Sequence, residues 1–506
     1  MKLFCMLYSK KHLRWDHFVF EQKKRISKLI DTISQMQELL AKLSNPSNAV
    51  SDCLAATEAI LFQVSQENPT PKKTIDLLQS IHSSFTALKG LAYIEKSSII
   101  PIDKQLSALK ISFEEEIQVK LNVVFFPYKA SMWDSLETIY KTAAKDEDCV
   151  AHVVPIPYYK LSKDEAIPTY EGELFPTDIP ITHYNDYILE EEQPDIVFLH
   201  NIYDEYNTLT RVHEQFFTSN LRNYTEMLVY VPYHISSFVA PKADTHSLAY
   251  DIPTVENVDK IVLVGDYLKK AAIHDGIPSE KLLVLGSPKL DAIVNAMGKD
   301  IPLPNGWAER VEGKTVYLIN TGCMFFAGIP FEALERLVDF LSIPKIDDQS
   351  VVIWRPHPLT KISIMKYAPY LLDYYVNLTE KYIKGKDKLY SGVILDEAED
   401  YIPALKVADV LISSDGSLLR SYLLTGKKVL FWDEKEPKGS LLPPDVFYYA
   451  FDRSEPWYEL VKKFPTGYDP LAKNRINIAA NVYANADGTS GEKVFASIKE
   501  CLFQRE

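Results

Sequence analysis

The spacing of apolar positions divides the chain into a helical first part and a longer part in which strands and helices alternate. Residues 21–43 carry apolar side chains at a three–four spacing, which is typical of an amphipathic helix. The same spacing predicts helices over 51–65, 74–93 and 103–120, and the prolines between them mark the breaks. Residues 1–118 are therefore predicted to form a helical extension that packs as a bundle and serves docking or oligomerisation.

From residue 121 onward, short apolar runs bounded by polar residues alternate with helical segments. The runs are 121–126, 150–155, 195–200, 228–233, 258–264, 282–285, 315–320, 351–354, 392–395, 410–413 and 429–432. Such runs are typical of parallel strands covered on both faces by helices. The pattern predicts an α/β fold with two doubly wound sheets, one in 119–298 and one in 314–470. A linker rich in Pro and Gly at 299–313 joins them, and helices in 471–506 follow.

One stretch of the first α/β region breaks the alternation. Residues 155–187 are rich in Pro and Tyr and too polar and interrupted for a core element. We expect them to overhang the sheet edge as a substrate loop, since binding residues are often carried on loops.

Composition narrows the possible partners and compartments. A net charge of -14 argues against nucleic acid as the main partner, because binding to a phosphate backbone needs clustered Lys and Arg. The five cysteines are scattered and have no metal or redox spacing, so we expect free thiols in a reducing cytoplasm. No apolar run reaches the roughly 18 residues of a membrane span, and the apolar start of the chain is too short for a secretory signal.

One basic cluster lies near the apolar stripe of the first predicted helix. It is formed by Lys10, Lys11, Arg14, Lys23, Lys24 and Arg25. Basic residues beside an apolar helix face can dock a protein on a membrane surface. This alternative stands beside the simpler one, a helical bundle packed on a neighbour or on a second copy of the chain.

Polar residues follow two of the predicted strands of the second sheet. Arg355 and His357 follow the strand at 351–354, and the turn of Ser414, Asp415, Gly416 and Ser417 follows the strand at 410–413. Ligands of open α/β sheets bind past the carboxyl ends of strands. A Ser/Asp/Gly turn that begins a helix favours anions, Arg can clamp a phosphate, and His can donate to one. The pattern predicts a site for a phosphorylated ligand such as a nucleoside diphosphate, although simple helix capping would explain the same turn.

Further candidates follow strands of the first sheet. His200, Asn201 and Asp204 come after the run at 195–200 and are candidate acceptor-side groups, with capping of the next helix as the alternative. His234 follows the run at 228–233 and is either functional or an ordinary structural histidine. No His, Cys or Asp cluster has metal-ligand spacing. We expect no tightly bound cofactor or metal, and Mg²⁺ on donor phosphates stays open.

Four segments in this order resemble a known bacterial family. Residues 263–268 and 281–291, Arg-Pro-His-Pro at 355–358 and Ser-Asp-Gly-Ser at 414–417 are similar to the corresponding segments of the CDP-glycerol glycerophosphotransferases, which build teichoic-acid-type polymers. The likeness covers roughly residues 120–435. His234 falls where the family carries a His after a strand of its first domain.

The resemblance implies a GT-B architecture, with an acceptor domain at 119–298 and a nucleotide-donor domain at 314–470. The implied reaction transfers a polyol phosphate, such as glycerol phosphate, from a CDP-polyol to a hydroxyl of a lipid-linked or polymeric acceptor in cell-wall or capsule synthesis. Peripheral contact with the inner face of the cell membrane is expected for such an acceptor.

The resemblance also assigns roles to residues of this chain. His234 would be the base, and His357 with Arg355 would bind the donor pyrophosphate and stabilise the leaving charge. The other implied donor-binding residues are Thr321, Gly322, Ser414, Asp415, Gly416 and Ser417. Gly286 and Ser287 would line the hinge and cleft.

Departures from the family pattern leave other functions open. His234 is followed by Ile235, Ser236 and Ser237 in place of a Gly-Thr type of turn, and residues 419–422 lack the acidic residue that the family often carries there. The turn at 321–324 also differs from the usual form. One alternative is a nucleotide-sugar glycosyltransferase or a sugar-nucleotide 2-epimerase on the same fold, and another is a non-catalytic relative within a biosynthetic complex.

Overall fold

The computed structural model describes residues 20–67, 70–162, 165–236, 252–386, 389–435, 440 and 442–504. Contacts divide the chain into two compact units. The first comprises Met1–Val123, Ala144–Ala151 and Ile188–Ile196, and the second comprises Val124–Ala143, His152–Tyr187 and Val197–Glu506. Four residues of the sequence analysis lie outside the described residues: Lys10, Lys11, Arg14 and Ser237.

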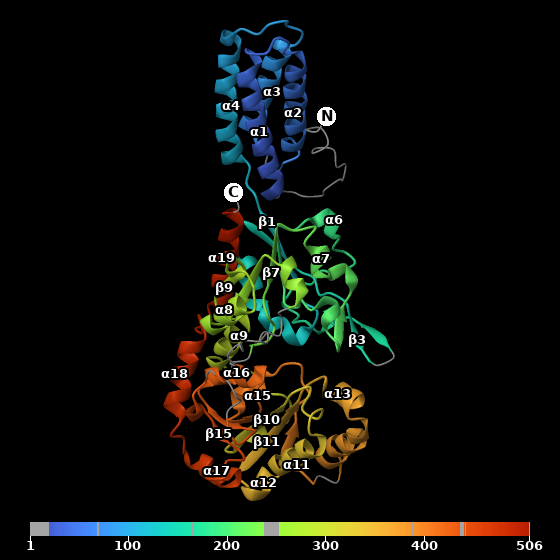
Figure 1. Cartoon of the computed structure of the whole chain (residues 1–506), viewed down its shortest axis with the longest axis vertical. Coiled ribbons are helices and arrows are strands. Elements are labelled where there is room, and N and C mark those ends of the chain that lie inside the picture. Colours follow the sequence, from blue (N-terminus) through green and yellow to red (C-terminus); the bar gives the residue numbers. More distant parts are fainter. Residues whose placement is uncertain are drawn as a thin grey trace. The chain divides into compact units, whose positions relative to one another are not determined.

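The helical extension is a four-helix bundle. Its helices are α1 (Phe20–Leu40), α2 (Ser47–Val64), α3 (Lys72–Leu88) and α4 (Lys96–Glu116), which lie side by side (Figure 1, blue). Ile30, Ile60, Phe85 and Leu109 are fully buried between them. The predicted helices are confirmed, but α4 begins seven residues earlier than predicted. Pro101 lies inside it, because burial of the flanking Ile99 and Ile102 offsets the one backbone hydrogen bond that proline removes.

The first parallel sheet has the strand order β2-β1-β5-β7-β8-β9. The strands are β1 (Leu121–Phe126), β2 (Cys149–Val153), β5 (Ile196–Leu199), β7 (Met227–Tyr230), β8 (Lys260–Leu263) and β9 (Leu282–Val284). The helices of this region are α5 (Glu137–Ala143), α6 (Leu189–Glu192), α7 (Thr218–Leu221), α8 (Asp266–His274) and α9 (Pro288–Met297). Strands β1, β5 and β7 are buried at every position, as expected for strands covered on both faces.

Residues 155–187 differ from the expected substrate loop. They contain β3 (Tyr158–Leu161) and β4 (Ala166–Thr169), which join β6 (Thr210–Val212) in a three-stranded antiparallel sheet. Tyr158 is only 1% exposed, and its ring contacts that of Tyr128 edge-on. The prediction that this stretch holds no core element was wrong, because single large aromatic side chains bury enough area to anchor short strands.

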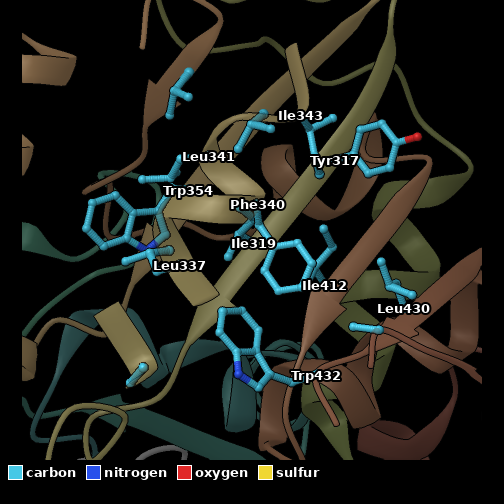
Figure 2. Close-up of a cluster of buried hydrophobic side chains, with 14 of the residues drawn as sticks. Tyr317, Ile319, Leu337, Phe340, Leu341, Ile343, Trp354, Ile412, Leu430 and Trp432 are labelled. Atoms are coloured by element: carbon cyan, nitrogen blue, oxygen red, sulfur yellow. The ribbon is translucent and has the colours of Figure 1, made fainter. Parts of the chain in front are cut away.

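The second parallel sheet has the order β12-β11-β10-β13-β14-β15. Its strands are β10 (Thr315–Thr321), β11 (Ser350–Pro356), β12 (Val393–Leu395), β13 (Val410–Ser413), β14 (Lys428–Phe431) and β15 (Tyr448–Tyr449), and all its paired strands are parallel. Figure 2 shows Trp354, Phe340 and Trp432 packed with aliphatic side chains of this core. The α/β fold with two Rossmann-like domains of GT-B type and a helical extension is confirmed.

Helices surround this sheet. They are α11 (Pro330–Leu341), α12 (Ile343–Ile346), α13 (Thr360–Tyr367), α14 (Leu372–Val376), α15 (Ile402–Val407), α16 (Ser417–Tyr422) and α17 (Trp457–Lys463). A short helix, α10 (Ala308–Val311), lies inside the stretch predicted as a linker. Ala368 and Pro369 separate α13, which ends at Tyr367, from the short helix α14.

Two C-terminal helices, α18 (Ala472–Val482) and α19 (Ser490–Phe503), follow the second sheet. Segment 482–491 returns to the first sheet: Asp291 of α9 accepts hydrogen bonds from the backbone N–H groups of Ser490 and Gly491 at 3.1 and 2.8 Å. Gly286 has φ +89°, and a Cβ there would lie 2.4 Å from the carbonyl oxygen of Ala484. Glycine is therefore required for this close approach.

Candidate functional site

Two histidines follow strands of the two parallel sheets, both within the second compact unit. His234 lies in the loop after β7, and His357 comes directly after β11. Both side chains remain partly exposed, yet burial is the main cause that lowers the pKa of each to about 4. Both ring nitrogens of His234 are buried, and a titratable group that is desolvated at the end of a strand is a candidate functional group.

The charges near the two histidines come from opposite halves of the unit. After burial, the strongest influence that lowers the pKa of His234 is Arg420 of α16, followed by Lys289 of α9. For His357 the corresponding residue is Lys129, in the loop after β1, followed by Arg355. Each histidine therefore faces a cation supplied by the other sheet.

Hydrogen bonds fix the tautomer of His357. Its Nδ1 accepts from the backbone N–H of Leu359 at 3.1 Å, and its own backbone N–H donates to the carbonyl of Thr321 at 2.9 Å. In the neutral ring the proton then resides on Nε2. His357 can therefore present an N–H donor while its backbone holds the turn after β10.

His234 lines a small pocket at the carboxyl ends of β7, β8 and β9. The pocket is lined by Val231, Pro232, His234, Ser236, Val262, Val264, Leu268, Gly286 and Ser287. The structure thus brings three of the predicted residues together, namely His234, Gly286 and Ser287. The ring of Tyr233 lies 5.1 Å from that of His234.

Arg355 has contacts that differ from those expected of a phosphate clamp. Its Nη1 lies 2.6 Å from the Asp396 carboxylate, which is 2% exposed, and its Nη2 donates to the carbonyl oxygens of Ala398 and Glu399. Nη1 and Nη2 of Arg355 therefore already donate to groups of the loop after β12 and hold that loop in place. A direct phosphate contact by Arg355 stays a prediction, and the contacts that Arg355 makes support a role in positioning that loop.

The Ser-Asp-Gly-Ser turn contacts the loop that carries His234. Asp415 accepts from Nε and Nη2 of Arg420 at 3.1 and 2.7 Å, and Ser417 Oγ accepts from the backbone N–H of Ile235 at 3.0 Å. Ser414 contributes its carbonyl to Ser413 Oγ. The backbone of Gly416 is extended, and a Cβ added there would have only the carbonyl oxygen of Ser414 near it among the described residues, at 3.9 Å.

The turn after β10 holds the remaining predicted donor residues. Thr321 is buried and its Oγ1 accepts from Trp354 Nε1 at 3.3 Å. A Cβ added at Gly322 would meet no atom within 4 Å, so the backbone there borders open space. Gly322 could approach a ligand, whereas the Thr321 hydroxyl is used within the core.

The predicted acceptor-side residues have internal partners. His200 is fully buried, its Nε2 accepts from the Tyr128 N–H at 3.1 Å, and burial lowers its pKa to about 3. Asn201 accepts from the Tyr203 N–H, and Asp204 accepts from the N–H and hydroxyl of Thr218. For Asn201 and Asp204 these contacts favour the capping alternative, whereas His200 holds the loop after β1 instead.

Sequence analysis missed the buried cations of the site. Lys129, Lys289 and Arg420 are each 7–8% exposed. Lys289 lies 2.7 Å from Asp134, which also accepts from the hydroxyl of Tyr401. Lys129 comes soon after β1 and Lys289 begins the helix after β9, so the strand-end rule that selected the histidines could have found both.

Among the described residues, no group of three or more His, Cys, Asp and Glu side chains is arranged to hold a metal ion. Within the same ranges, no helix combines the length and apolar character that a membrane span needs.

Comparisons with known proteins give matches among solved structures. No family model matches the chain, and no curated protein matches it. The complex of S. aureus MnaA with UDP has a TM-score of 0.51 at 13% identity, over 76% of this chain and 97% of that chain. The wall teichoic acid polymerase TagF (H548A) has a TM-score of 0.48 at 14% identity, over 76% and 90%. The Neisseria meningitidis UDP-GlcNAc 2-epimerase bound to UDP-GlcNAc has 0.45 at 13%, over 76% and 100%. At these identities, the likeness to MnaA shows that the chain shares its fold.

Proposed function

We propose that the chain is a transferase that binds a nucleoside-diphosphate-linked donor between its two sheets. The crossed arrangement of charges carries this proposal: Arg420 faces His234 and Lys129 faces His357. Lys289 and Arg420 already pair with Asp134 and Asp415, whereas burial lowers the pKa of Lys129, and a buried cation is costly unless an anion joins it. A diphosphate supplies the required charge.

The reaction that fits these groups is transfer of a polyol phosphate, with glycerol phosphate as the first candidate. The acceptor hydroxyl oxygen forms a bond to the phosphorus that bears the polyol, and the pyrophosphate P–O bond breaks. CMP leaves with the electron pair of that bond. His234 takes the acceptor proton as general base.

His357 acts on the donor. Its Nε2–H, fixed by the Leu359 contact at Nδ1, donates to a phosphate oxygen and stabilises the charge that grows on the leaving group. Lys129 adds a positive charge from the other sheet, and the exposed backbone of Gly322 lets the phosphate approach closely.

The acceptor belongs to the same proposal. We assign it as a hydroxyl of a lipid-linked or polymeric molecule, reached by peripheral contact with the inner face of the membrane. The helical bundle would support docking or association with a second copy.

A second candidate function is a nucleotide-sugar transferase or a sugar-nucleotide 2-epimerase. The observation that favours it is the fold shared with MnaA, whose solved structure contains UDP. Glu399 and Asp400 also lie in the loop held by Arg355, and the charge of Glu399 acts on Lys129. An epimerase would release a free sugar nucleotide, whereas the transferase consumes its donor only when an acceptor is present.

A binding panel tests the proposal. CDP, CDP-glycerol, CDP-ribitol, UDP, GDP and UDP-sugars are compared by calorimetry and thermal shift. A ligand at 100 times its Kd stabilises the folded state by about 2.7 kcal/mol. We expect selective binding of the CDP compounds, at least tenfold weaker in Lys129→Gln.

The matched control is Lys462→Gln, an exposed lysine of α17 on the second half, which should bind like the wild type. Selective binding of UDP compounds would favour the second candidate. If no nucleotide binds, the non-catalytic alternative becomes the better account.

A further inference from the structure

Arg420 connects the donor-side turn to the loop that carries His234. Its Nη1 donates to the carbonyl oxygen of Ile235 at 2.5 Å, while Ser417 Oγ accepts from the N–H of the same residue at 3.0 Å. Both residues belong to α16, 182 and 185 positions along the chain from Ile235. Ile235, in the loop that carries His234, is thus bound through both its backbone N–H and its backbone carbonyl.

The guanidinium itself is held rigidly. Asp415 accepts from its Nε and Nη2, Tyr483 donates its hydroxyl proton to the carbonyl oxygen of Arg420, and Arg420 is 8% exposed. Both donors converge on one carboxylate oxygen, Oδ1 of Asp415, and two charge-assisted hydrogen bonds to one atom restrict the rotation of the guanidinium. The third donor is therefore directed at Ile235 without further loss of side-chain freedom.

We propose that Arg420 is a positioning residue for His234: with Ser417 it holds the peptide groups of Ile235, so that the donor-side turn sets where the acceptor-side base stands. The hydrogen bonds that Arg420 and Ser417 make with the backbone of Ile235 form what we call the clamp. Its catalytic meaning rests on the proposed function, but the clamp itself can be tested without any turnover. It also gives a role to residues 419–422, where the chain departs from the family it resembles.

The charge of Arg420 acts on the same histidine. His234 is surrounded by Arg420 from α16, Lys289 from α9 and the ring of Tyr233, and Asp415 offsets part of the charge of Arg420. After burial, these cations lower the pKa of His234 to about 4. A diphosphate bound beside Arg420 would offset the charge of this cation and so reduce its share in the lowering of that pKa, while burial, the largest cause, would remain.

The first experiment follows the His234 ring by NMR in protein labelled at histidine, with His234→Gln to assign the signal. In Arg420→Gln the pKa of His234 should rise by about 1, because a nearby positive charge is lost. Arg420→Lys keeps the charge and loses the fork geometry, so its His234 pKa should stay low. An unchanged pKa in Arg420→Gln would show only that the charge of Arg420 does not act on His234, whereas a His234 ring signal that moves in neither Arg420→Lys nor Ser417→Ala overturns the proposal.

Turnover separates the clamp from a structural role. With CDP-glycerol and a polyol-phosphate acceptor, Arg420→Lys and Ser417→Ala should lower kcat at least tenfold, with the donor KM changed less than threefold. In Arg420→Gln the acidic limb of the pH profile should move to higher pH. The control Arg336→Gln, at a partly exposed arginine of α11, should match the wild type.

The outcomes distinguish the two proposals. If the wild type shows no turnover but the His234 ring signal still moves in Arg420→Lys and in Ser417→Ala, the clamp stands and the transferase function fails. If turnover is present and all three clamp variants retain it, the clamp is wrong. Should Arg420→Gln fail to fold, Arg420→Lys and Ser417→Ala still decide, since each removes one contact and leaves the others.

Discussion

Arg355 Nη1 and the Asp396 carboxylate lie 2.6 Å apart at the ends of neighbouring strands, with side-chain exposures of 10% and 2%. The guanidinium also donates to three backbone carbonyls, those of Ala398, Glu399 and Asp400. This pair fixes the loop that continues to Tyr401, whose hydroxyl donates to Asp134. Loss of the Arg355–Asp396 pair is expected to change the stability of the fold, and this effect can be measured separately from nucleotide binding.

Arg355→Ala should destabilise the second sheet strongly. Removing one partner of a buried pair leaves an uncompensated charge and costs about 3–5 kcal/mol. Urea denaturation measures the change. The control is Arg336→Ala, whose partners Glu332 and Asp433 are largely exposed and whose loss should cost about 1 kcal/mol or less. A stable Arg355→Ala protein that no longer binds nucleotide would instead support the phosphate clamp.

His357→Ala should lower the turnover of a CDP-polyol by about 10²-fold or more, as expected for lost charge stabilisation in the transition state. Stopped assays with fixed acceptor, at saturating donor, measure the effect on kcat. His82→Ala provides the control, because that residue lies in the bundle and pairs with Glu58. Wild-type turnover in His357→Ala would remove the role assigned to its Nε2–H.

His200 should make folding stability depend on pH below 6.5. Burial lowers its pKa from 6.5 to about 3 in the folded state, so the unfolded chain binds the proton first as the pH falls. The stability that neutral His200 provides is complete above pH 6.5 and is lost toward pH 3, by up to about 1.4 kcal/mol per pH unit. Asp204, whose pKa burial raises to about 6, acts in the opposite direction between its ordinary pKa and 6.

The variant His200→Gln isolates this contribution. Glutamine can still accept from the Tyr128 N–H but does not titrate. We expect a lower free energy of unfolding at pH 7 and a smaller loss between pH 7 and pH 5 than in the wild type, measured by urea denaturation. Parallel pH profiles for the two proteins would show that His200 is not the group responsible.

Gly286→Ala should loosen the return of residues 482–491 to the first sheet. An added Cβ would lie 2.4 Å from both the Ala484 carbonyl oxygen and Ser490 Oγ. Gly276→Ala is the matched control, because its φ of +93° is similar and its Cβ would meet nothing within 4 Å. The control should cost about 1–2 kcal/mol from backbone strain, and Gly286→Ala should cost more and expose 482–491 to proteolysis. Equal losses would mean that the contact relaxes freely.

Much of the fold follows from the sequence because its elements are strongly periodic or uniformly apolar. Strands such as β10 and β13 are buried on both faces, and their apolar runs show this without knowledge of their partners. The bundle helices carry a three–four stripe. The hairpin of β3 and β4 was missed because its anchoring depends on Tyr158 finding Tyr128, a tertiary contact that local pattern does not contain.

The position of the candidate site was predictable from the sequence, but the hydrogen-bond and ion-pair partners of its residues were not. The rule that ligands bind past the ends of strands identified His234, His357 and the 414–417 turn. Whether a guanidinium serves a ligand or a neighbouring carboxylate depends on what lies opposite it in the fold, and Arg355 and Asp396 are 41 positions apart. Nothing in the sequence pointed to the role of Arg420, because residues 419–422 stood out only for lacking an acidic residue.

The attachment of Ser490 and Gly491 to Asp291 has a consequence for biogenesis. These contacts span 199 and 200 positions, and Thr138 adds a hydrogen bond to the same carboxylate over 153. At a synthesis rate of about 5–20 residues per second, α19 leaves the ribosome roughly ten seconds or more after α9, so the first sheet lacks this covering helix during that time. Through that interval the surface later covered by α19 would be open to chaperones and to wrong partners. Contacts this distant in sequence also slow folding, so the fold is completed only after the ribosome has passed both sheets.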